Sequence, residues 1–263
     1  MLDKINSYLK VVPDYENKNK NKRGIIICAG CRHFLSASIN INLLEKYDIE
    51  IEWYYVGDEL LEFQKDYLKN KKNVKLINCL DIIPKWYPEK ITEYNLKGFM
   101  IKPFALMMSN FKEIILLDAD NIPLINPLNL FESDDYKKYG NIFWKDVKFD
   151  NENINNNIYK KSSDIFNKYK IKSPQENNFD WAESGQIVIN KEKCWKALCL
   201  SYYFNYNHDY YYKIFFGDKD LYYLGFKLTN TSYYQHQYYP HGLSDDKVEF
   251  SKINMLIQRS PID

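Results

Sequence analysis

The sequence lacks the features that mark several classes of protein. Its formal net charge is only +1 and no basic patch stands out, which argues against binding nucleic acid through bulk phosphate attraction. No apolar run approaches the roughly 18 residues needed to span a bilayer, and residues 1–22 do not have the pattern of a signal peptide. Only three of the 36 basic residues are Arg, which, with the richness in Asn, Ile and Tyr, indicates AT-biased coding. We therefore expect a cytoplasmic protein without a transmembrane segment.

Cysteine is scarce and scattered. The five cysteines, an odd number, are Cys28, Cys31, Cys79, Cys194 and Cys199. Their spacing is not that of a disulfide framework. Cys28 and Cys31 have redox spacing, but no matching second motif accompanies them, so we expect reduced and mostly packed thiols.

Strand-like and helix-like stretches alternate along the chain, which predicts an α/β fold with a mainly parallel sheet. Strands are expected at 24–30, 49–56, 74–78, 113–117, 140–144 and, after a turn, within 181–190. Helices are expected at 34–46, 58–69, 98–110, 192–207 and from 217 onward. The polar segment 1–22 is interpreted as an arm, and 148–178 as a long, mobile excursion that forms a lid.

The segment from Glu113 to Leu124 combines a buried strand with two acids. The run 114–117 is continuously apolar, the pattern of a strand covered on both faces, and Asp118 and Asp120 follow it directly. Side chains two residues apart point the same way in a strand, so the two carboxylates could face one hard cation. A polar turn after a core strand is the alternative.

Further polar residues are predicted at the same edge of the sheet. Lys102 could add a cation, although a surface lysine would show the same pattern. Glu183, in the turn 183–186, could place a carboxylate at a reacting carbon or simply cap the turn. Asp218 and Asp220 could join the site or cap a helix N-terminus.

Several blocks of the sequence form one ordered pattern: Arg23–Gly30, Lys102–Leu106, Phe111–Leu124 with Pro127 and Leu130-Phe131, Gly140–Asp146, Glu183–Gln186 with Asn190-Lys191, and Gly217–Asp220. In this order they resemble the fungal Golgi alpha-mannosyltransferase family, whose alpha-1,3 and alpha-1,2 enzymes extend mannan and branched glycans. A single D-x-D motif occurs widely by chance, but blocks in this order and spacing are specific. The resemblance covers most of the chain from residue 23.

The resemblance implies a GT-A type glycosyltransferase fold, a Rossmann-like sheet flanked by helices, over 23–263. It implies a retaining transferase that moves mannose from GDP-mannose to a glycan or glycoprotein, with a UDP-sugar as the alternative donor. By position, each matching residue acquires an expected role. Asp118 and Asp120 would hold Mn²⁺ or Mg²⁺ and the diphosphate, Ala29 and Gly30 would meet the nucleotide, Lys102 and Gln186 would contact the donor, Glu183 would lie at the transferred sugar, and Asp218 and Asp220 near the acceptor.

Two departures from the family stand out. Fungal members carry a membrane anchor and this sequence shows none, which implies a cytoplasmic enzyme encoded by a large DNA virus or another AT-rich genome. Family members also follow the segment Met255–Pro261 with an F-x-H-type motif whose His is a metal-ligand candidate, whereas this chain ends at Asp263. Either His236 or His241 substitutes, or the chain is a fragment of a longer protein, or metal binding is impaired.

Two rival functions remain open. Phosphatases and phosphotransferases of the haloacid dehalogenase type also have a strand ending in D-x-D, in which Asp118 would be a nucleophile. The acids of Gly217–Asp220, together with Asp245 and Asp246, would then be the distal metal acids. That class expects the motif near the chain start, followed by T or V at a set position, and Asn121 and Ile122 follow here. The second rival is a nucleotide-sugar- or glycan-binding module without turnover.

Overall fold

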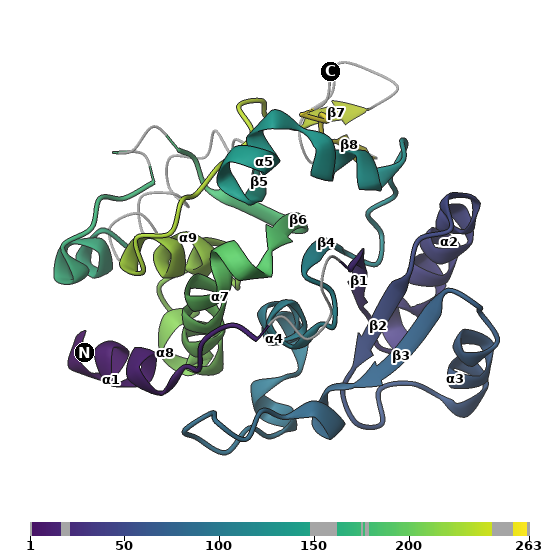
Figure 1. Ribbon diagram of the computed structural model, residues 1–263, viewed down its shortest axis with the longest axis horizontal. Helices are drawn as coiled ribbons and strands as arrows, with labels where there is room; N and C mark the ends of the chain where they lie inside the picture. Colours follow the sequence, from purple (N-terminus) through teal and green to yellow (C-terminus); the bar gives the residue numbers. More distant parts are fainter. Residues whose placement is uncertain are drawn as a thin grey trace.

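A mixed sheet in the strand order β3-β2-β1-β4-β6-β5 lies at the centre of the protein (Figure 1). The computed structural model describes residues 2–16, 22–147, 162–174, 176, 179–243 and 255–261. The strands of the sheet are β1 (Arg23–Cys28), β2 (Ile51–Tyr55), β3 (Val74–Asn78), β4 (Glu113–Leu117), β5 (Asn141–Lys145) and β6 (Ala182–Asn190). The first four run parallel, whereas β6 is antiparallel to both β4 and β5. The predicted α/β class with a mainly parallel sheet is confirmed.

The apolar runs of the strands supply two hydrophobic cores, one on each face of the sheet. Ile26 and Leu116 belong to one core, whereas their chain neighbours Ile25 and Leu117 belong to the other. Successive strand side chains point to opposite faces, so a strand covered on both faces is apolar at every position. This burial explains why the strand before Asp118 has no polar alternation.

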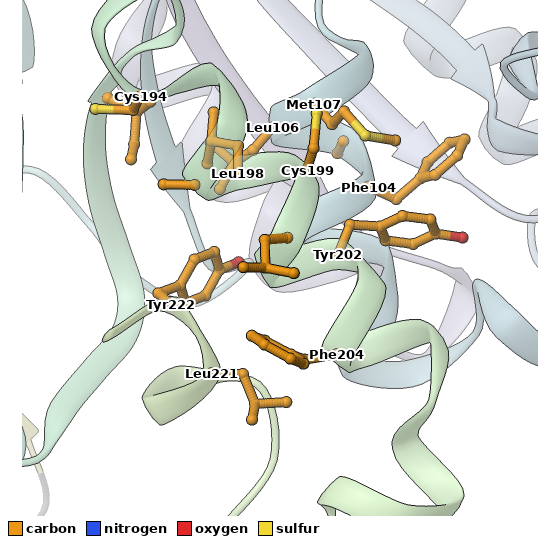
Figure 2. Close-up of a cluster of buried hydrophobic side chains, with 14 of the residues drawn as sticks. Phe104, Leu106, Met107, Cys194, Leu198, Cys199, Tyr202, Phe204, Leu221 and Tyr222 are labelled. Atoms are coloured by element: carbon orange, nitrogen blue, oxygen red, sulfur yellow. The ribbon is translucent and has the colours of Figure 1, made fainter. Parts of the chain in front are cut away.

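Helices cover both faces. They are α1 (Leu2–Val11), α2 (Phe34–Leu44), α3 (Glu62–Lys69), α4 (Ile101–Met108), α5 (Asp134–Tyr139), a helix at 162–169, α7 (Lys191–Tyr206), α8 (His208–Tyr211) and α9 (Lys219–Leu228). Two short strands, β7 (His241–Leu243) and β8 (Met255–Ile257), pair separately. The side chains of α4, α7 and α9 interdigitate in one core, where Phe104 of α4 and Tyr202 of α7 lie close together (Figure 2). This packing fixes the start of α4 and the start of α9 relative to the sheet.

Part of the segment predicted to be a polar arm is a packed helix. In α1, Ile5 and Tyr8 are buried, and the Tyr8 hydroxyl donates a hydrogen bond of 2.9 Å to the carbonyl of Cys199 in α7. The interpretation as an arm is therefore wrong for this helix. Its apolar residues recur at helical spacing among Lys, Asp and Asn, so the polar composition of 1–22 obscured a narrow apolar stripe.

Two further predictions need correction. Residues 183–186 do not form a turn but lie in the extended strand β6, where Trp144 pairs with Glu183 and Leu117 with Gln186. In the predicted lid, the described part contains the helix at 162–169, whose Phe166 is buried in the core. The polar composition of 148–178 and the Asn-rich patch 151–157 led to the prediction of an excursion, and of this range 148–161, 175 and 177–178 lie outside the described residues.

The cysteines are free thiols, as the sequence predicts. Cys79, Cys194 and Cys199 are buried, and burial raises the pKa of the Cys28 thiol above its ordinary value. A redox thiol needs a lowered pKa, so Cys28 does not have the environment of a redox thiol.

Candidate active site

The candidate site lies at one edge of the sheet, where β1, β4 and β5 end and β6 begins. The pairing of Leu117 with Gln186 and of Trp144 with Glu183 brings these strand ends together. The backbone N–H of Asp118 donates to the carbonyl of Gly185 at 2.7 Å, which ties the residue after β4 to β6. Open α/β sheets bind ligands at this carboxyl edge of their parallel strands.

Buried Lys102 and half-buried Asp118 form an ion pair at this edge. Lys102 Nζ lies 2.7 Å from Asp118 Oδ1 and 2.8 Å from Oδ2, and it also donates to the carbonyl of Ser184 at 3.2 Å. Lys102 is only 8% exposed, so its alternative interpretation as a surface lysine is wrong. Burial alone would lower the pKa of Lys102, but the nearby carboxylates of Asp218 and Asp118 raise it above its ordinary value. The lysine is a fixed cation within the site.

Asp120 differs from Asp118 in its environment. β4 ends at Leu117, and residues 119–120 form a turn that leaves Asp120 exposed. Asn121 anchors this turn, because its Nδ2 donates to the carbonyl of Gly185 at 3.0 Å and its own carbonyl accepts from Asn40 Nδ2 at 2.8 Å. The alternation of a strand therefore does not extend to Asp120, and joint metal binding by the two acids stays a prediction.

Glu183 lies beside Gly185 at the start of β6. Its Oε1 accepts a hydrogen bond of 2.5 Å from the Gly185 N–H. A Cβ on Gly185 would lie 2.9 Å from Glu183 Oε1, so a side chain there would crowd this carboxylate. Burial and the carboxylate of Asp146 raise the pKa of Glu183, whereas Lys219 and Lys102 act in the opposite direction.

The start of α9 supplies two buried acids to the same edge. Asp218 and Asp220 are 3% and 4% exposed. Asp218 Oδ1 accepts from the Ser184 hydroxyl at 3.1 Å, and Oδ2 is buried without a hydrogen bond from the described residues. The Asp218 side chain makes no capping hydrogen bond, so the alternative of a simple helix cap is wrong for it. Asp220 Oδ1 accepts from the N–H of Ala182 at 3.4 Å, and burial raises the pKa of Asp220 to about 7.

Three residues of the site were missed by sequence reasoning: Ser184, Asp146 and Lys219. Asp146 follows β5 as Asp118 follows β4, and it pairs with Lys219 of α9. The signal was present, since an acid after a buried strand had already identified Asp118. Gly217–Asp220 was interpreted only through its two acids, although the lysine between them neutralises the acid after β5.

Ala29 and Gly30 follow β1 at the same edge. The Ala29 N–H donates to the carbonyl of Tyr54, and a Cβ on Gly30 would lie 3.1 Å from Cβ of Glu59. Gly30 thus allows close approach of the loop after β2. Contact of Ala29 and Gly30 with a nucleotide stays a prediction.

Neither His236 nor His241 joins the acids. His236 is buried, and its backbone N–H donates to the carbonyl of Phe143 on the outer strand of the sheet. His241 lies in β7, apart from the six-stranded sheet. Among the described residues, no group of three His, Cys, Asp or Glu side chains could hold a metal ion. The third ligand considered from the sequence is therefore not found in the described part of the chain, and Asp245 and Asp246 lie outside it.

A cavity of about 530 Å³ lies at the opposite edge of the sheet, where the parallel strands begin. Its lining includes Glu52, whose carboxylate already accepts hydrogen bonds from Tyr54, Ser109 and Asn110. This saturated carboxylate has a structural role, so we assign the site to the carboxyl edge of the strands.

Within the described residues, no helix is both long and apolar enough to cross a membrane.

Curated relatives are fungal mannosyltransferases. Alpha-1,2-mannosyltransferase MNN23 of Candida albicans is 25% identical over 284 residues, which cover 93% of this chain and 46% of the relative. Alpha-1,2-mannosyltransferase MNN2 of Saccharomyces cerevisiae is 30% identical over 198 residues, 63% of this chain and 32% of the relative. The chain thus spans less than half the length of these two relatives.

Similar solved structures include two glycosyltransferases. The bifunctional glycosyltransferase WbbM in its apo form has a TM-score of 0.47 at 9% identity, with 73% of this chain and 36% of that chain covered. The galactosyltransferase LgtC, in complex with donor and acceptor sugar analogues, has a TM-score of 0.45 at 14% identity, with 78% and 70% covered. The three-dimensional likeness is partial, and family membership depends on the sequence.

Residues 22–247 match the sequence profile of a family described as "Mannosyltransferase putative". The match includes every acid and lysine of the site described above. It agrees with the resemblance seen in the sequence, and the mainly parallel sheet agrees with the Rossmann-like sheet that this resemblance implies. The chain belongs to this mannosyltransferase family of glycosyltransferases.

Proposed function

We propose that the chain is a retaining, nucleotide-sugar-dependent alpha-mannosyltransferase that moves mannose from GDP-mannose to a glycan or glycoprotein. Family membership supports the transferred sugar. The observation that carries the proposal is the convergence of Lys102, Asp118, Glu183 and Asp218 at the carboxyl edge of the sheet. This combination of fixed cation and carboxylates suits a donor whose diphosphate is negative and whose reacting carbon becomes positive.

Asp118 and Asp120 fit a Mn²⁺ or Mg²⁺ ion that is shared with the donor. Both offer carboxylate oxygens just beyond β4, and Asp120 is exposed to ligands. Mg²⁺ is usually held by one or two carboxylates together with substrate phosphates and water, so two acids without a third protein ligand are compatible with such a site. When bound, the ion would neutralise the diphosphate and make it a better leaving group.

The chain's own residues would then orient the reacting groups and balance their charges. Lys102 stays charged because carboxylates surround it, and it holds Asp118 in one position. Burial and Asp146 raise the pKa of Glu183, and Lys219 and Lys102 oppose this shift. In its ionised form, Glu183 would stabilise positive charge at the transferred carbon either as a nucleophile or electrostatically. Asp218 Oδ2, without a hydrogen bond from the described residues, would accept one from a sugar hydroxyl.

Two alternatives have support of their own. Ala29 and Gly30, which we place at the nucleotide, have no side chain that could distinguish guanine from uracil. A UDP-sugar is therefore the alternative donor to GDP-mannose. A nucleotide-sugar- or glycan-binding module without turnover is the second, because no third metal ligand accompanies Asp118 and Asp120 in the described residues. A cytoplasmic location and an origin in a viral or other AT-rich genome stay predictions.

A nucleotide-sugar panel with and without Mn²⁺ tests the proposal. Thermal shift and donor hydrolysis would be measured with GDP-mannose, UDP-glucose and UDP-N-acetylglucosamine. We expect GDP-mannose to raise the Tm and to be hydrolysed slowly only when Mn²⁺ is present. Stabilisation by UDP-sugars alone would overturn the donor assignment, whereas tight binding without hydrolysis or transfer would favour the binding module.

A further inference from the structure

Two exposed phenylalanine rings flank the charged site. Phe99 is 56% exposed and Phe216 is 70% exposed, and of the described phenylalanines only Phe63 is comparably exposed. Phe99 lies three residues before Lys102, and Phe216 lies two residues before Asp218. The segments that supply the cation and the buried acid thus also present apolar rings to solvent. Exposed aromatic surface beside a polar site commonly marks a binding surface.

The backbone of Gly217 brings the two segments together. Gly217 has a φ of +78°, and a Cβ placed on it would lie 3.5 Å from Cδ2 of Phe99. The Phe99 ring therefore lies against the backbone next to Phe216. Glycine is suited to this position because it accepts a positive φ.

Each ring also lies near an ammonium group of the site. Lys102 Nζ is 5.9 Å from the centroid of Phe99, and Lys219 Nζ is 5.5 Å from the centroid of Phe216. Both lysines are themselves paired with acids, Asp118 and Asp146. Apolar ring faces and hydrogen-bonding charged groups therefore alternate over a short distance.

This combination matches the surface of a hexopyranose. A pyranose ring has faces formed by C–H groups, which pack on aromatic rings, and a rim of hydroxyls, which need hydrogen-bond partners. A purely apolar ligand would remove water from the charged groups beside the two rings without offering them hydrogen bonds, which costs free energy. We propose that Phe99 and Phe216 form the stacking surface for the acceptor saccharide. This inference rests on the proposed transferase function and specifies where its acceptor sugar binds.

Direct titration with free saccharides tests the surface without requiring turnover. Methyl alpha-mannoside and an alpha-linked mannobiose would be titrated into the unmodified chain, Phe99→Ala and Phe216→Ala, followed by NMR or calorimetry. We expect each substitution to weaken mannobiose binding on the order of tenfold. Phe216→Trp should retain binding, because the aromatic face is kept. Phe63→Ala, which removes a similarly exposed ring of α3, is the matched control and should bind like the unmodified chain.

Measuring the Kd for GDP-mannose in the same variants distinguishes an effect on acceptor binding from an effect on nucleotide binding. We expect Phe99→Ala and Phe216→Ala to raise the KM for the acceptor while the Kd for GDP-mannose stays unchanged. Unchanged saccharide binding in both variants would overturn the proposal. A weakened GDP-mannose Kd with unchanged saccharide binding would overturn it too, because the rings would then stack on the nucleobase. If the chain turns over no nucleotide-sugar at all, the transferase function fails, while the saccharide titration still decides whether the rings bind sugar.

Discussion

Replacing Asp220 by Asn should stabilise the protein at neutral and alkaline pH. The carboxyl group is 4% exposed, and burial raises its pKa to about 7, whereas the same group in the unfolded chain titrates near its ordinary value. Between these values the folded state binds a proton that the unfolded state does not, so the contribution of Asp220 to stability falls as pH rises. A difference of about three units corresponds to about 4 kcal/mol above pH 7. The Asn amide keeps an oxygen that can accept from the Ala182 N–H.

Urea unfolding at several pH values between 4 and 8.5 would measure this effect. The free energy of unfolding of Asp220→Asn minus that of the unmodified chain should increase between pH 4 and 7 and then level off. Asp66→Asn, which removes an exposed carboxylate of α3, is the matched control for the change of charge. A flat or falling difference for Asp220→Asn would refute the assignment of a buried acid whose ionisation lowers stability. Transfer activity should fall in the same variant if Asp220 also serves the acceptor.

Three more outcomes are expected. Asp120→Asn should reduce Mn²⁺-dependent turnover on the order of a thousandfold with an unchanged Tm, and near-normal activity in the presence of a chelator would contradict the metal assignment. Lys191→Met removes a buried ammonium but also its hydrogen bond of 2.6 Å to the Ser109 carbonyl, so it should raise the free energy of unfolding by less than about 3 kcal/mol below pH 8. Burial lowers the pKa of Lys191 to about 8, so this gain should shrink between pH 8 and 10 in urea titrations. Gly225→Ala should lower stability by about 1–3 kcal/mol, because its Cβ would lie 2.5 Å from Ser201 Oγ and 2.8 Å from the Ala197 carbonyl. An unchanged Tm would show that α7 and α9 can separate at no cost.

The strand before Asp118 was predictable because full burial on both faces leaves a continuous apolar run. The helix at 98–110 was predictable for a similar reason, and α4 with the preceding turn occupies most of it. The direction of β6 was not, since an antiparallel strand between covering helices has the same apolar run as a parallel one. The first residues of β6 were also interpreted as a turn, although they extend the strand into the site.

The sequence by itself determined the family, the α/β class and the identity of most charged groups at the site, because these depend on local runs and on motif order. Only the tertiary structure decided how those groups pair. Lys102 and Asp118 are sixteen residues apart and meet at 2.7 Å, and Asp146 meets Lys219 across an even longer separation. Only the structure showed that Asp120 is exposed while Asp218 and Asp220 are buried. Burial and pairing depend on how strands and helices pack, and no local pattern of residues encodes the distance between two strand ends.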